Sequence, residues 1–473
     1  MLSLTRFFRL SPSDYEGLHR RYRSMLDGLD MRMLGTLGYD VRKRLTSLFE
    51  GMMRSLFKEN GAEFRVDLVA DPAVQEFVGA HASVMDSAFE KVEMSDAMRR
   101  RLTRSNYIFS GMKAFHELHE AFPSLLDENG NRKPFERFLN DVQSIDATYN
   151  ANYLRAEYNF VAASAEMAGK WEQFMRDGDR YNLQYRTQQD YKVRPEHAAL
   201  DRVTLPPSDS FWEEFYPPNG WNCRCTVVQV RKSKYPETSH DEAMRLGDEA
   251  LQRDTKGIFR FNAGKEGKSV PDYNPYTIRR CSTCPVAKGS KGGKLAAFVP
   301  ENEVCKACVL VHQCEQLRGE VIKHGKGTIE VSHLVDRRDG DYERLMAVAR
   351  HFASDGAHVV LTPKMTRPPK FEYDCVYGSL RGTRYDGKCP DLRIGEHWYE
   401  HEGFSSDNPK NAFRNMLNHG LKQSDRIIID RPDLTDAYMK RIINQRIKDG
   451  HPISEVWLNE NGQLRLLYKK SEE

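Results

Sequence analysis

The sequence lacks any long hydrophobic run, which sets it apart from proteins that cross membranes. No window approaches the roughly 18 apolar residues that a membrane-spanning helix needs. The first ten residues hold an apolar run that is too short and too interrupted for a secretory signal peptide. We therefore expect a protein that is cytosolic at synthesis and has no membrane partner.

An excess of charge of either sign is also missing. The chain carries 71 Lys and Arg residues against 68 Asp and Glu residues, for a net charge of +3, so bulk charge does not indicate a nucleic-acid partner. The mean hydropathy of −0.68 is consistent with long helices that have solvated faces. At about 150 residues per domain, a chain of 473 residues predicts three domains.

Cysteine is scarce outside one region. Seven of the nine cysteines lie between positions 223 and 314. Four of them form two CxxC pairs, separated by 20 residues: Cys281 with Cys284, and Cys305 with Cys308. In a reducing compartment this spacing is typical of a zinc ribbon or treble clef, where four thiolates hold a structural ion. The alternatives are a loop with reduced thiols, and a zinc site in which His312 or Cys314 replaces one of the four.

The first half of the chain predicts helices. Residues 12–130 have a helical pattern, with Ser95 as an N-cap for the run that follows it. From Pro134 to residue 176, apolar and aromatic residues recur every three or four positions, which predicts one long helix or two in series. Short strands and prolines follow to Val230. Residues 233–275 have the composition of a linker with one helix.

The most informative motif is Pro-Pro-Asn-Gly-Trp-Asn-Cys-Arg-Cys at positions 217–225. Its prolines impose an extended entry, and the Asn-Gly pair supplies a left-handed turn. Cys223 and Cys225 are two apart and face the same side of a strand. With His197 they offer a small metal site that lacks an evident fourth ligand. Packing as buried structural cysteines under the tryptophan is the alternative interpretation.

This motif, with the Arg194-Pro-Glu-His197 turn and the Pro-Pro-Ser-Asp stretch at 206–209 before it, resembles the phage Mu F-like minor head proteins, a family of head-morphogenesis proteins. The resemblance is strong over residues 134–232 and says nothing about the last third of the chain. It implies a non-enzymatic role in capsid assembly, with portal and capsid proteins as partners. It also implies a place in the virion after synthesis in the bacterial cytoplasm.

The last part of the chain alternates helix and strand. A helix and a buried strand over 342–362 precede two strands joined at Gly395-Glu396. Asp391 opens the first strand of this hairpin, and Glu400 and Glu402 share one face of the second. Three carboxylates that converge at strand ends are typical ligands of a divalent cation.

A helix over 410–421 and a strand over 426–430 follow. The order helix, strand, strand, strand, helix, strand resembles the core of the restriction-endonuclease-like nucleases. Pro390-Asp391 with Glu400-x-Glu402 resembles their PD…(D/E)xK signature, with glutamate where lysine is expected. The role of the missing lysine then falls to one of three residues: Lys388, Lys422 or His419. Histidine is the natural acid or base near neutral pH.

A second resemblance covers roughly residues 335–470. Lys388-Cys-Pro-Asp-Leu, Trp398-Tyr-Glu and residues 420–430 resemble the tRNA-nuclease toxin domains of contact-dependent inhibition proteins. Related nuclease domains fused to phage head proteins work without metal. The resemblance implies an RNA substrate, tRNA above all, and an immunity protein as a partner.

The site residues of this candidate ribonuclease fall into two groups. Those assigned to catalysis are Asp391, Glu400, Glu402, His419 and Lys422, and those assigned to nucleic-acid binding are Lys388, Arg414 and Arg426. In the alternative interpretation, Asp391 and Glu400 belong to an ion-paired strand end and the neighbouring aromatic residues are core.

Together these patterns predict an α+β multidomain protein. Its parts are a helical region over 1–133, a Mu F-like core over 134–232, a linker over 233–275, a zinc-ribbon-like insert over 276–320 and an α/β nuclease-like domain over 325–473. We expect a phage or prophage minor head protein that carries a nuclease toxin-like domain on a zinc-stapled linker. One alternative is a purely structural virion protein with an inert nucleic-acid-binding domain. Another is a mobile-element toxin that uses the head module for delivery.

Overall fold

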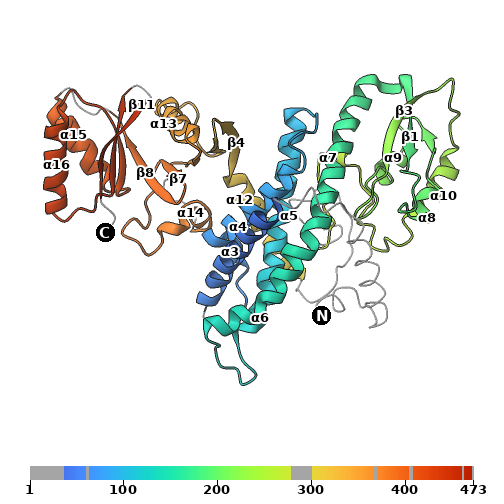
Figure 1. Ribbon diagram of the computed structural model, residues 1–473, viewed down its shortest axis with the longest axis horizontal. Coiled ribbons are helices and arrows are strands. Elements are labelled where there is room, and N and C mark those ends of the chain that lie inside the picture. Colours follow the sequence, from blue (N-terminus) through green and yellow to red (C-terminus); the bar gives the residue numbers. More distant parts are fainter. Residues whose placement is uncertain are drawn as a thin grey trace. The chain divides into compact units, whose positions relative to one another are not determined.

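The computed structural model describes residues 37–59, 63–277, 301–365, 370–403, 408–460 and 463–470. The chain divides into two compact units (Figure 1). The first consists of Met1–Val69 and Ala73–His312, and the second of Ala70–Pro72 and Gln313–Glu473. In the described part of the chain, no helix combines the length and apolar character needed to cross a bilayer.

Long helices make up most of the first unit. They are α3 (Leu37–Lys58), α4 (Pro72–Ser87), α5 (Asp96–Ala121), α6 (Phe135–Ala147) and α7 (Leu154–Asp177). A π-helical turn, Thr148–Tyr153, joins α6 to α7, so the prediction of two helices in series is confirmed. The Ser95 hydroxyl accepts a hydrogen bond from the backbone N–H of Met98 and begins α5, as its N-cap pattern predicts.

A small antiparallel sheet follows α7 in the first unit, with strand order β2-β1-β3. Its strands are β1 (Tyr181–Arg186), β2 (Thr204–Leu205) and β3 (Thr226–Arg231). The short helices α8 (Pro195–Ala198) and α9 (Phe211–Glu214) lie in its connections, and α10 (His240–Ala250) follows β3.

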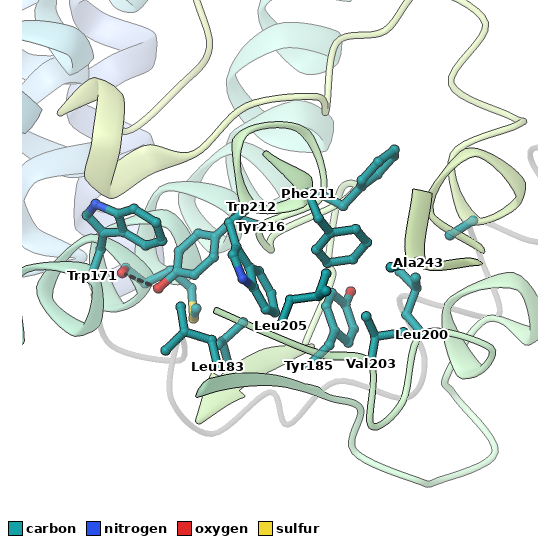
Figure 2. Packing of buried hydrophobic residues seen from close by; sticks show 14 of the residues in the cluster. Trp171, Leu183, Tyr185, Leu200, Val203, Leu205, Phe211, Trp212, Tyr216 and Ala243 are labelled. Carbon is teal, nitrogen blue, oxygen red and sulfur yellow. Dashed lines mark hydrogen bonds between the residues drawn. The ribbon is translucent and has the colours of Figure 1, made fainter. Parts of the chain in front are cut away.

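Aromatic side chains fill the core between this sheet and α7 (Figure 2). Trp212 and Tyr216 are fully buried, and each places its polar atom on a backbone carbonyl. The Trp212 Nε1–H donates to Pro206 O at 3.0 Å, and the Tyr216 hydroxyl donates to Met167 O on α7, also at 3.0 Å. Because the buried donors are satisfied, the rings stabilise the packing of the sheet against α7 without an unpaired polar group.

The segment expected to be a linker packs into the first unit instead. Asn262 is buried, caps the short helix α11 (Ala263–Glu266) and donates to Trp212 O at 2.9 Å. Gly264 lies so close to Trp171 that a Cβ would collide with the indole side chain. The Tyr276 hydroxyl donates to Glu157 on α7 at 2.8 Å. Within the segment predicted as a linker over 233–275, Asn262 and Gly264 therefore pack closely, because a glycine and a buried polar cap allow it. The helix predicted in this segment is present as α10.

Half of the expected zinc insert lies outside the described residues, including Cys281 and Cys284. The other pair, Cys305 and Cys308, lies on helix α12 (Glu301–Leu317). Residues three apart on a helix share a face, so the two thiols leave the helix on the same side. This differs from a turn between two strands, the arrangement of a ribbon knuckle. The zinc site itself stays a prediction.

The second unit contains an eight-stranded sheet with the order β11-β10-β9-β8-β7-β6-β5-β4. The strands are β4 (Gly319–His324), β5 (Gly327–Ser332), β6 (His358–Leu361), β7 (Leu392–Ile394), β8 (His397–Glu402), β9 (Arg426–Asp430), β10 (Glu455–Glu460) and β11 (Gln463–Lys469). Strands β6, β7 and β8 form an antiparallel meander, and β9 runs parallel to β8.

Helices cover both faces of this sheet (Figure 1). They are α13 (Tyr342–Ser354), α14 (Lys370–Tyr377), α15 (Pro409–Gly420) and α16 (Asp436–Lys448). Ile428 packs in the core that includes α13, whereas Ile427 and Ile429 pack in the core that includes α15 and α16. The predicted helix over 342–354, the hairpin at Gly395 and the predicted order of six elements are present, with α14 inserted between β6 and β7.

Candidate functional site

Two buried carboxyl groups meet where β7 and β8 pair in the second unit. Leu392 and Tyr399 are register partners, so Asp391 lies across from Glu400 at the start of the hairpin. The backbone N–H of Asp391 donates to Glu400 Oε2 at 3.2 Å, and the backbone N–H of His401 donates to Asp391 Oδ2, also at 3.2 Å. The hairpin therefore brings together two of the three carboxylates that the sequence assigned to catalysis.

These carboxyl groups are poorly solvated and repel one another. Asp391 is 7% exposed and Glu400 is 6% exposed. Burial raises the pKa of Asp391. Burial, together with the charges of Asp391 and Glu402, raises the pKa of Glu400 well above its usual range. Burial also raises the pKa of Glu402. A bound cation would relieve this repulsion.

His419 completes the cluster from α15. Its Nδ1 lies 2.5 Å from Glu402 Oε1. Ligand atoms of Glu400, Glu402 and His419 all lie within 4.8 Å of one another. A Cβ at Gly420, the next residue, would come within 3.3 Å of the Glu402 side chain, so glycine lets α15 approach β8 closely. Two carboxylates and an imidazole are a fitting ligand set for a divalent cation.

Lys364, which the sequence analysis missed, supplies a positive charge near the carboxylates. Burial acts to lower the pKa of Lys364, but the charges of Asp391, Asp339 and Asp341 raise this pKa above its usual value. Its Nζ lies 3.5 Å from Asp339 and 3.6 Å from Asp341. Pairing of β6 with β7 places the chain after β6 beside the chain before β7. Only this non-local pairing indicates that Lys364 belongs to the site.

The other predicted site residues are not among the ligand atoms of this cluster. Lys422 is exposed in the turn after α15, where its backbone N–H donates to His419 O at 3.0 Å. Arg414 is exposed on α15, and Lys388 is half-buried in the loop that leads to Asp391. Arg426 lies on β9, on the face of the sheet opposite to Glu400. Ile427 is the register partner of Glu400, so Arg426 alternates to the opposite face, and it pairs with Asp425 at 3.2 Å.

In the first unit, hydrogen bonds and ion pairs fix the loop that carries the Pro-Pro-Asn-Gly-Trp-Asn-Cys-Arg-Cys motif. Arg194 Nη2 donates to Trp221 O at 2.7 Å, and the Tyr185 hydroxyl on β1 donates to Asn219 Oδ1 at 2.8 Å. Arg224 makes two hydrogen bonds of 2.7 Å to the Asp190 carboxylate. The motif is therefore held by β1 and by the chain between β1 and β2.

Comparison with known proteins shows that this segment is similar to one family. Residues 128–228 match the family described as "Phage Mu protein F like protein". "Putative capsid assembly protein F" of Escherichia phage Mu is 31% identical over 226 residues, which cover 44% of this chain and 49% of that protein. The Mu-like prophage FluMu F protein of Haemophilus influenzae (strain ATCC 51907 / DSM 11121 / KW20 / Rd) is 26% identical over 147 residues, or 29% of this chain and 32% of that protein.

The chain thus spans half or less of the length of these two relatives. No solved structure matches it at a significant level. The matched segment contains α6, α7, β1 and the loop with the cysteine pair. The chain is therefore Mu F-like over residues 128–228, within its first compact unit.

Proposed function

We propose that the first unit acts in the assembly of a phage or prophage head and becomes part of the virion. The observation that carries this proposal is the Mu F-like segment, together with the 31% identity to a protein named for capsid assembly. Portal and capsid proteins are the expected partners. The aromatic core around Trp212 and Tyr216 supports the proposal, because it gives the segment a fixed shape for assembly contacts.

Head formation in the element that carries the gene tests this proposal. Deletion of the gene is expected to reduce the yield of mature heads, and the full chain supplied from a plasmid is expected to restore it and to be found in purified particles. The chain with Glu400→Gln serves as a matched control that should restore assembly equally well. Normal heads without the gene, and particles without the protein, contradict the proposal.

We further propose that the second unit is a nuclease that acts on RNA, tRNA above all. The observation that carries this proposal is the buried pair of Asp391 and Glu400 at the centre of the sheet, with half-buried Glu402 and exposed His419 beside Glu400. The antiparallel meander β6-β7-β8, with β9 parallel to β8, has the strand order and directions of a restriction-endonuclease-like core. Carboxylates at these strand positions support phosphodiester hydrolysis rather than a purely structural role.

Each side chain has a specific task in this proposal. Asp391 and Glu400 would hold a divalent metal, which when bound polarises the phosphate and activates a water molecule. Lys364 stands in for the lysine that Glu402 replaces and stabilises negative charge on the phosphate. Glu402 orients His419 through the 2.5 Å contact, and His419 moves a proton. In a metal-free mechanism, the Glu402–His419 pair is the acid–base group.

Three basic side chains on segments next to the site residues would hold the phosphate backbone. Lys388 precedes the site, Arg414 lies on α15 and Lys422 follows it. Such contacts do not depend on base sequence. An active nuclease in its own host implies an immunity protein as a further partner of this unit.

Inducible expression of the full chain in a bacterium without the gene tests the nuclease. We expect growth arrest and tRNA cleavage, both lost with Lys364→Ala and partly kept with Lys364→Arg. If growth stops without RNA cleavage and the chain binds nucleic acid, the result favours the alternative of an inert nucleic-acid-binding domain. If the chain is folded but the cells grow normally and their RNA and DNA stay intact, the nuclease proposal is wrong. Head assembly then remains as the proposed function.

A further inference from the structure

Three metal-ligating side chains of the first unit converge at one point between α8 and the loop before β3. His197 Nδ1 lies 3.9 Å from Cys223 Sγ and 3.9 Å from Cys225 Sγ. All three ligand atoms lie within 4.8 Å of one another. His197 and Cys223 are buried and Cys225 is half-buried, so the cluster is closed on most sides and open near Cys225.

These separations suit a tetrahedral zinc ion. Zinc–sulfur bonds of about 2.3 Å and zinc–nitrogen bonds near 2.0–2.1 Å, at the tetrahedral angle, set sulfur and nitrogen roughly 3.6 Å apart. The sulfur–nitrogen separations are 3.9 Å. They reach the zinc-bound value if each sulfur and the nitrogen move about 0.3 Å closer together. Two thiolates and an imidazole are also the soft ligand set that selects zinc or copper(I) over magnesium or calcium.

The backbone around the cysteines positions their thiols for this role. Asn222 has φ of +57°, in the left-handed region, and turns the chain just before Cys223. The backbone N–H of Cys223 donates to Gly220 O at 3.1 Å. A Cβ at Gly220 would come within 3.1 Å of the Arg194 guanidinium, which itself holds Trp221 O. These contacts fix the loop on the same turn that carries His197.

We propose that His197, Cys223 and Cys225 bind one zinc ion, which joins the loop before β3 to helix α8. The ion has three protein ligands and takes a water molecule in the fourth position, on the side of Cys225. It acts as a staple for the Mu F-like segment, because it adds metal–ligand bonds to the hydrogen bonds and the Arg224–Asp190 ion pair that hold the loop. The site is separate from the CxxC pairs and does not need them.

Cobalt(II) binding to the full chain tests the proposal in a background where the four CxxC cysteines are replaced by serine. Cobalt(II) in a tetrahedral thiolate site gives visible d–d bands and near-ultraviolet thiolate-to-metal absorption. We expect one thiolate-bound cobalt per chain, displaced by zinc. Cys223→Ser/Cys225→Ser should lose both absorptions, and His197→Ala should weaken binding several-fold. The matched control Cys375→Ser/Cys389→Ser should bind like the background protein.

A readout on the wild-type chain covers the case in which a variant fails to fold. Alkylation of Cys225, followed by mass spectrometry, should be several-fold slower with zinc than with a chelator, because zinc-bound thiolate is protected. Equal alkylation in both states, or the same cobalt spectrum with and without Cys223 and Cys225, overturns the proposal. Either result would assign these cysteines to packing alone.

Discussion

Lys113 Nζ donates to Glu157 Oε2 at 2.6 Å inside the first unit, where both side chains are buried. The same ammonium donates to Tyr149 O at 2.8 Å and lies 3.1 Å from His81 Nε2. The other oxygen of Glu157 accepts from the Tyr276 hydroxyl. Burial acts to raise the pKa of Glu157, but Lys113 and His81 lower this pKa to about 2. This network connects α4, α5, α7 and the chain near Tyr276.

Removal of one partner of this pair should destabilise the first unit strongly. We expect Glu157→Gln to cost about 3–5 kcal/mol, because it leaves the Lys113 ammonium buried without a counter-charge. The double variant Lys113→Met/Glu157→Gln should recover part of the loss. Hydrogen exchange of peptides from α5 and α7 in urea measures the effect on this unit alone. Glu242→Gln breaks an exposed ion pair with Arg245 and should leave exchange unchanged; an equal loss there contradicts the reasoning.

The stability of the first unit should also fall as the pH rises from about 4.5 to about 8. Burial raises the pKa of Glu117 to about 8. A raised folded-state pKa means that the folded unit holds a proton which the unfolded chain has released. The stabilising contribution is therefore full below the ordinary pKa of about 4.5 and is lost as the pH rises through about 8. Glu117→Gln should remove this loss of stability in the hydrogen-exchange measurement. An unchanged dependence of stability on pH would contradict the prediction.

Buried histidines give the opposite trend in acid. Burial lowers the pKa of His81 and of His116 to about 4. Between about 6.5 and 4, the unfolded chain binds protons that the folded unit does not, so stability should fall as the pH drops through this range. His116→Gln should make the fall shallower. A fall that starts only below pH 4 would show that neither histidine drives it.

The carboxylate cluster should control toxicity. Glu400→Gln and Asp391→Asn are expected to abolish RNA cleavage by the full chain, because each removes a candidate metal ligand. Glu396→Gln, in the exposed turn of the same hairpin, should retain it. A chelator should abolish cleavage in the metal mechanism. In the metal-free mechanism a chelator has no effect and His419→Ala lowers the rate by about 100-fold or more.

Phosphate contacts should show in the salt dependence of RNA binding. Lys388→Ala and Arg414→Ala should weaken binding to all RNA sequences alike and lower the slope of log K against log salt by about 0.7 each on single strands. Lys326→Ala, in the turn between β4 and β5 at the far edge of the sheet, is the matched control and should leave the slope unchanged. A loss confined to one sequence would indicate base contacts instead.

The CxxC pairs should hold a zinc ion of their own. Protein purified without chelator should lose about one zinc per chain with Cys281→Ser/Cys305→Ser, because the two CxxC pairs together supply the four thiolates of one tetrahedral ion. Elemental analysis measures the change. Zinc content equal to that of the wild type would leave these cysteines as reduced thiols.

Local patterns in the sequence predicted the parts of the fold that local interactions determine. Ser95 begins α5, and the hairpin at Gly395 brings Asp391 to Glu400. The errors have a non-local origin. Asn262 and Gly264 lie in the predicted linker, yet they pack against Trp212 on α9 and Trp171 on α7. Lys364 is close to Asp391 only because β6 pairs with β7.

The crossover from β8 through α15 to β9 has an evolutionary consequence. Asp391, Glu400, Glu402 and His419 all lie between positions 391 and 419, on elements that are neighbours in the sheet or cover it. A single recombination event in this region would exchange the whole cluster at once. A lineage could thus gain, lose or retarget the proposed nuclease while the Mu F-like segment, at 128–228, is inherited unaltered.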